Sequence, residues 1–109
     1  MFINYARFLS TIFATLFLIF SQIAAQEEWM FYENKGLIQF NEKMDKYAIL
    51  SLQKAVRLNP NAYKSISTLG QIELRDGDKQ SARNYFRQSL EINPMQEDTL
   101  VICGELEDF

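Results

Sequence analysis

The stretch YKSISTLGQIELRDGDKQSARNYFRQSLEINPMQ, residues 63–96, decides the fold. Each half carries apolar residues at the three- and four-residue spacing of a helix face, which predicts two amphipathic helices. Between the halves, Gly77 suits a left-handed turn residue and Asp78 suits the cap of a following helix. Pro94 cannot continue the second helix, because it has no backbone N–H to donate. The stretch therefore predicts two antiparallel helices joined by a tight turn.

The features of this stretch recur with a period of about 34 residues, which is typical of helical repeats. Three glycines have this spacing, namely Gly36, Gly70 and Gly104. So do three pairs: Ala48 and Ala82, Ile38 and Ile72, and Asn59-Pro60 and Asn93-Pro94. The period predicts an earlier helix pair, Trp29–Phe40 and Tyr47–Leu58 around a polar link at Asn41–Asp45. It also predicts one later helix at Gln96–Glu107.

These residue types at these spacings resemble the tetratricopeptide repeat. The second unit matches the family pattern best, at Leu69, Gly70, Gly77, Ala82, Phe86, Leu90 and Pro94. The first unit keeps Tyr32, Gly36, Ala48, Leu52, Ala55 and Pro60, but it has Lys35 for a Leu and Lys43 for the turn Gly. The third keeps Leu100, Cys103 and Gly104. The resemblance implies an all-α superhelix with repeats at 29–62 and 63–96 and a partial repeat, acting as a capping helix, at 97–109.

In repeats of this family, the first helix of each pair lines a concave groove that binds partner peptides. The resemblance implies a groove made of Met30, Glu33, Leu37, Phe40 and Asn41 in the first unit and Lys64, Ser67, Gln71, Leu74 and Arg75 in the second. Some members hold a partner's terminal carboxylate with Lys and Asn, but the corresponding places here carry Glu33 and Leu37. The alternative is that Met30, Leu37 and Phe40 pack on a neighbouring helix while the polar residues are solvated.

Residues 1–25 have the three parts of a secretory signal peptide. Arg7 supplies a positive charge, the apolar run FLSTIFATLFLIF spans Phe8–Phe20, and small residues lead to Ala25. We expect cleavage after Ala25, which makes residues 26–109 the folded domain. The alternative is an uncleaved membrane anchor, for which the segment Phe8–Ala25 is at the lower limit of length. Both alternatives predict that the remainder of the chain is exported, because the positive end stays inside.

The sequence offers no chemistry for catalysis, a cofactor or a metal. It contains no His, its serines lack a nucleophile elbow, and no phosphate loop or metal-ligand spacing occurs. Arg7 is the one charged residue of 1–25, so cleavage changes the net charge from −3 to −4. A domain with this acidic net charge lacks the basic surface that nucleic-acid binding requires. Cys103 has no second Cys to pair with, and we expect it to be buried as a small apolar residue.

These observations predict an exported bacterial protein of the periplasm or cell envelope that binds another protein and is not an enzyme. The alternative is a membrane-tethered structural protein whose repeats self-associate. Two repeats and one further helix leave apolar surface uncovered at the ends of the array. Leu100 and Cys103 are expected to cover the second repeat, whereas Val101 and Phe109 stay exposed. We therefore expect self-association, as a homo-oligomer, or stabilisation by the partner through one of these ends.

Overall fold

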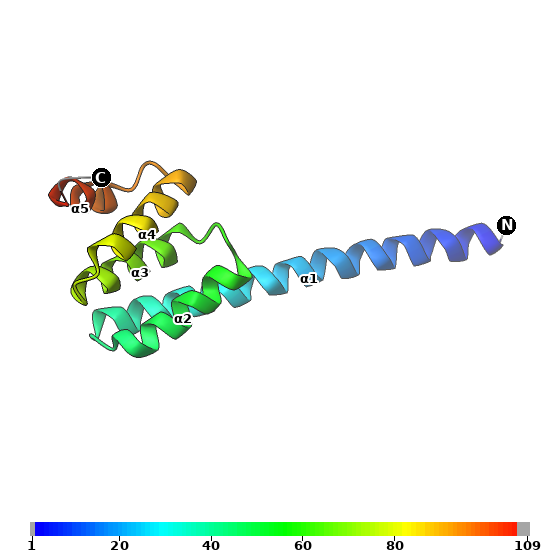
Figure 1. Cartoon of the computed structure of the whole chain (residues 1–109). Helices are drawn as coiled ribbons and strands as arrows, with labels where there is room; N and C mark the ends of the chain where they lie inside the picture. Colours follow the sequence, from blue (N-terminus) through cyan, green and yellow to red (C-terminus); the bar gives the residue numbers. More distant parts are fainter. Residues whose placement is uncertain (1, 107–109) are drawn as a thin grey trace.

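Five helices follow one another along the chain, and the computed structural model describes residues 2–106, with side chains at 4–24 and 27–106. They are α1 (Phe2–Asn41), α2 (Asp45–Leu58), α3 (Tyr63–Arg75), α4 (Lys79–Ile92) and α5 (Glu97–Glu105). Helices α1 and α2 pack as one pair and α3 and α4 as a second, with α3 against both helices of the first pair (Figure 1). The expected all-helical fold of packed helix pairs is confirmed.

The turn inside each pair uses the same backbone conformation at positions one period apart. Gly77 has φ = 87° and Lys43 has φ = 60°, both in the left-handed region. Glycine adopts this conformation freely, whereas for Lys43, which has a Cβ atom, the same conformation costs about 1 kcal/mol of conformational free energy. The first unit therefore keeps the turn of the second although its sequence has lost the turn glycine.

Helix α4 begins at the predicted cap. The Asp78 carboxylate accepts a hydrogen bond from the backbone N–H of Ser81 at 3.0 Å and from the Ser81 hydroxyl at 2.8 Å. The backbone bond, followed by the hydroxyl bond, holds the pKa of Asp78 below its ordinary value. These bonds satisfy one of the unpaired donors at the start of the helix, so α4 begins where the sequence predicts.

Two glycines of the repeat lie where the helices of a pair cross closely. A Cβ atom at Gly36 would lie 2.6 Å from the Leu52 side chain, and one at Gly70 would lie 2.7 Å from the Phe86 ring. Leu52 and Phe86 are both fully buried, so neither can easily give way. The close crossing expected at Gly70 is therefore present, and the first pair repeats it at Gly36.

The core of the described residues has two clusters, of which the first lies between the two helix pairs. The first joins the buried residues Ala48, Leu52, Leu69 and Ile72, and Leu37 and Phe40 of α1 pack against it. The second consists of Ala82, Phe86 and Cys103, with Leu74, Leu90, Ile102 and Leu106 packed around it. Cys103 is buried as expected, and this burial raises the pKa of its thiol.

Helix α1 differs most from the expectation. It does not begin at Trp29 but runs unbroken from Phe2 to Asn41, through the predicted cleavage point at residues 25 and 26 (Figure 1). Residues 24–28 contain neither Gly nor Pro, and Ala, Gln and Glu are good helix formers, so nothing ends the helix there. The first half of α1 projects away from the other helices and exposes its apolar side chains. By length and composition this helix could cross a membrane.

Helix α5 also departs from the expectation. It spans Glu97–Glu105 rather than Gln96–Glu107, and Glu107 and Phe109 lie outside the described residues. Cys103 covers the second repeat as expected, but Leu100 does not, because it is 49% exposed. Thr99 takes that buried place instead, at 2% exposure. Val101 is exposed, as predicted.

Candidate functional site

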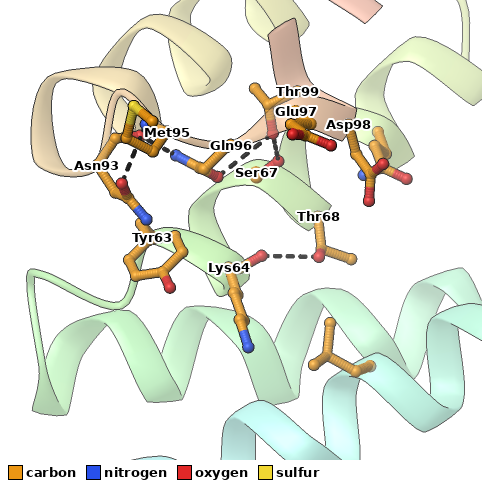
Figure 2. A pocket seen from close by; sticks show the side chains of 12 residues that line it. Tyr63, Lys64, Ser67, Thr68, Asn93, Met95, Gln96, Glu97, Asp98 and Thr99 are labelled. Carbon is orange, nitrogen blue, oxygen red and sulfur yellow. Dashed lines mark hydrogen bonds between the residues drawn. The ribbon is translucent and has the colours of Figure 1, made fainter. Parts of the chain in front are cut away.

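An open hollow of about 490 Å³ lies on the face formed by α3, the start of α5 and one residue of α1. Helix α3 contributes five residues along one side, namely Tyr63, Lys64, Ser67, Thr68 and Gln71. The α4–α5 link and the first turn of α5 contribute Asn93, Met95, Gln96, Glu97, Asp98 and Thr99 (Figure 2). Leu37 of α1 completes the lining. Three elements distant in sequence therefore share one concave surface.

Hydrogen bonds fix the floor of the hollow. The hydroxyls of Ser67 and Thr99 lie 2.7 Å apart and join α3 to α5. The Gln96 side chain donates to the backbone carbonyls of Ser89 and Asn93 at 2.9 and 2.7 Å and accepts from the hydroxyl of Ser89 at 3.0 Å. These bonds tie the α4–α5 link to α4 and hold the start of α5 beside α3. The hollow is thus shaped in advance of any binding.

The rim of the hollow carries charges of both signs. Lys64 is exposed on the α3 side, and Glu97 and Asp98 are exposed on the α5 side (Figure 2). Met95 is 84% exposed and adds a flexible apolar side chain at the same edge. Such a surface can contact a chain segment through separate charged and apolar groups, because Met adapts to irregular shapes.

Four of the ten groove residues predicted from the sequence line this hollow: Leu37, Lys64, Ser67 and Gln71. Ser67 is 5% exposed and its hydroxyl bonds to that of Thr99, so it holds α5 in place. Lys64 is exposed and Gln71 is partly exposed, which makes them the accessible polar members. The hollow therefore contains the first three predicted groove residues of α3 and one of the predicted residues of α1.

The other six predicted groove residues lie outside the hollow. Glu33 accepts a hydrogen bond from the Ser65 hydroxyl at 2.8 Å, and Leu74 packs in the cluster around Phe86. Arg75 lies over the Phe40 ring, 4.0 Å from its centre, and forms an ion pair with Asp45 at 3.5 Å. Met30 and Asn41 are exposed on α1. Packing between helices thus accounts for Phe40 and Leu74. The alternative interpretation holds for Phe40 and for Leu37, which also packs against the first cluster, but not for Met30, which is 46% exposed.

The sequence reasoning missed the whole α5 side of the hollow. The period itself could have found Asp98, because it stands one period after Lys64, which stands one period after Met30. The link residues Asn93, Met95 and Gln96 had no such signal, because their positions depend on how the chain turns after Pro94.

Among residues 2–106, no group of three or more His, Cys, Asp or Glu side chains could hold a metal ion.

The second helix pair is similar to a known repeat family. Residues 63–94 match the family model described as Tetratricopeptide repeat, and this range covers α3 and α4. Repeats of this type are typically non-catalytic, and no catalytic family was found. The search of curated proteins gave no match.

Proposed function

We propose that the chain is a non-enzymatic protein-interaction module, an adaptor or a subunit of a larger assembly, that binds a segment of a partner protein in the hollow between α3 and α5. The observation that carries the proposal is the concave surface beside α3, the first helix of the pair whose sequence matches a tetratricopeptide repeat. A preformed concave surface lowers the entropy lost on binding.

The lining suggests the chemistry of the bound segment. Lys64 and Asp98 occupy equivalent positions of neighbouring units and have opposite charges. A partner segment with an acidic side chain near Lys64 and a basic one near Asp98 would complement both. Leu37 and Met95 offer apolar contacts, and the Gln71 amide can both donate and accept hydrogen bonds to the backbone of the segment.

Charge reversal at Lys64 tests the proposal. With the full chain in its native host, Lys64→Glu should lower partner recovery after crosslinking by about fivefold, since the change replaces an attraction by a repulsion worth roughly 1 kcal/mol. Lys79→Glu is the matched control, because Lys79 is also a Lys in the first turn of a helix but is exposed outside the hollow. Equal recovery with the two variants would rule out binding in the hollow.

We further propose that the apolar part of α1 directs the chain out of the cytoplasm, into the periplasm or cell envelope, and is removed after Ala25. The support is Arg7 before the apolar run, the small residues before Gln26, and the exposure of this half of α1. Removal would leave Gln26–Asn41 as the first helix of the first repeat. That segment contains the residues of α1 that pack on α2, including Gly36.

The N-terminus of the exported form tests this processing. Intact-mass measurement of the envelope-located protein should give the mass of residues 26–109, with Gln26 at the N-terminus. Detection of Met1 on that form would contradict cleavage and support the alternative, a tethered structural protein.

One observation favours the tethered alternative. The hydroxyls of Thr11 and Thr15 donate to the backbone carbonyls of Arg7 and Thr11, each at 2.8 Å. Hydroxyls bonded within their own helix need no water, which suits a bilayer interior. In this alternative α1 stays intact, spans the membrane and continues directly into the first repeat, whose neighbouring copies associate.

A further inference from the structure

The first helix pair has an uncovered face on which large apolar side chains lie beside charged ones. Phe31 and Ile38 of α1 are 60% and 58% exposed, and Tyr47 of α2 is 56% exposed. Lys35 and Glu42 are exposed and follow Phe31 and Ile38 by four residues each, so they continue the same stripe of the helix. Glu42 stands just beyond α1, but its backbone N–H still donates to the carbonyl of Ile38 at 3.0 Å. We refer to Phe31, Lys35, Ile38, Glu42 and Tyr47 as the outer face.

The outer face lies on the side of the first pair that is turned away from the second pair. Phe40 of α1 and Ile49 of α2 pack against the buried cluster that the two pairs share. Ile38 and Tyr47 each come two residues earlier, which places them on nearly the opposite side of their helices. The earlier part of α1 does not fold back over this side, because the helix is unbroken and its first half projects away (Figure 1).

The second unit shows that this side of a first helix is suited to packing. One period after Lys35 and Ile38 stand Leu69 and Ile72, which are 4% and 0% exposed. Helix α3 uses these two residues to pack on the first pair. In α1 the apolar residue is kept at Ile38, whereas the Leu is replaced by Lys35. The outer face is therefore an apolar packing surface to which charges have been added.

The added charges are complementary to an inverted copy of the same face. Lys35 and Glu42 are seven residues apart, with Ile38 about midway between them. Two antiparallel stripes that cross at Ile38 bring Lys35 of each copy opposite Glu42 of the other, whereas parallel stripes bring like charges together. Among residues 2–106, Lys35 and Glu42 form no ion pair or side-chain hydrogen bond. Both charges are therefore available for a second copy.

We propose that the outer face binds a second copy of the chain in a twofold-symmetric dimer with antiparallel α1 helices. Ile38 and Tyr47 of both copies pack around the axis, and Phe31 packs at the two ends of the contact. Two Lys35–Glu42 ion pairs flank the axis, one on each side. Such an interface uses the same surface on both copies, so it closes at two chains and does not grow into a filament.

The dimer leaves the hollow between α3 and α5 free. No residue of the outer face lines that hollow. A dimer therefore presents two hollows, and a partner with two suitable segments gains affinity because the second segment binds intramolecularly.

The antiparallel arrangement points the apolar halves of the two α1 helices in opposite directions. Two copies anchored by α1 in the same membrane therefore cannot form this dimer, so in the cell it rests on the processing after Ala25 that is proposed above. Full chains in detergent can form it, because each apolar half can lie in its own micelle. The dimer is thus tested separately from the processing, which the N-terminal mass tests.

Charge exchange tests the antiparallel contact. Sedimentation equilibrium of the full chain in detergent micelles at low ionic strength should show a dimer that forms with increasing concentration. Lys35→Glu and Glu42→Lys should each weaken the dimer at least tenfold, because the symmetry makes each substitution change two contacts. The double variant, with both substitutions in one chain, should restore the wild-type affinity. Lys79→Glu is the matched control, since Lys79 is exposed outside the outer face, and it should leave the dimer unchanged.

An apolar substitution tests the centre of the contact. Ile38→Gln should weaken the dimer at least tenfold, because the two Ile38 side chains meet at the axis. The urea midpoint of the monomer, measured at high dilution, should stay unchanged because Ile38 is 58% exposed within its own chain. A dimer that keeps its affinity after Ile38→Gln would contradict the packing of this residue at the axis.

Three results would overturn the proposal. The first is a wild-type chain that stays monomeric at every concentration. The second is association that both single charge variants leave unchanged, which would indicate parallel contact through the apolar half of α1. The third is a double variant that remains as weak as the single variants, which would show that Lys35 and Glu42 do not face each other across the dimer.

Discussion

Replacement of Phe86 by Ala is expected to lower the free energy of unfolding by about 3–5 kcal/mol. Phe86 is fully buried, packs with Ala82 and Cys103, and lies directly over Gly70. Its removal leaves a cavity where α3, α4 and α5 meet, so the loss includes both the buried apolar surface and the lost packing. Urea unfolding of the full chain in detergent micelles, followed by circular dichroism at the helix band, measures the change.

Phe31→Ala provides the control for that experiment. Phe31 is 60% exposed, and its contact in the structure is an edge-to-face arrangement with Tyr32 at 5.3 Å between ring centres. A substitution at such a surface position changes stability by about 0.5 kcal/mol or less. Similar losses for Phe86→Ala and Phe31→Ala would contradict the packing of the second pair around Phe86.

Gly70→Leu should lower the free energy of unfolding by about 1–3 kcal/mol, because it overpacks a close helix crossing. A Cβ atom alone at this position would lie 2.7 Å from the Phe86 ring. The sign of the change in the free energy of unfolding distinguishes a crowded from an uncrowded position. Leu is a better helix former than Gly and would stabilise an uncrowded position by up to about 1 kcal/mol. The same urea experiment distinguishes the two outcomes.

Gly104→Leu is the matched control, one period later in the sequence. Among the described residues no atom would lie within 4 Å of its Cβ, so the helix propensity of Leu should dominate and the urea midpoint should stay or rise. A midpoint that falls equally in both variants would show that the crossing at Gly70 is not what determines the effect.

Much of the repeat array could be predicted from the sequence, because its determinants are local. The apolar spacing, the turn at Gly77 and the cap at Asp78 all act within a few residues, and the repeat period relates one unit to the next. Lys43 is instructive, since the first unit keeps the left-handed turn although its residue does not favour it. Packing of α1 on α2 maintains that turn, and no local pattern contains this information.

The ends of the array and the site could be predicted less well. The path of α1 through residues 25 and 26 depends on the absence of any helix-ending residue there, which the signal-peptide pattern does not consider. The hollow depends on the turn after Pro94, which brings Asp98 and Thr99 beside α3. Leu100 is half exposed because no helix in the described part of the chain covers it, a property of its neighbours and not of its own sequence.

The central claim is that a partner segment lies in the hollow between α3 and α5, and site-specific photocrosslinking tests it most directly. A benzophenone side chain is placed at Met95, which is 84% exposed at the rim of the hollow, or at Gln80, which is exposed on α4 and outside it. The account predicts one discrete adduct from position 95 in the native host, lost on Lys64→Glu, and none from position 80. Equal adducts from both positions, or an adduct from position 95 that Lys64→Glu leaves unchanged, would contradict binding in the hollow.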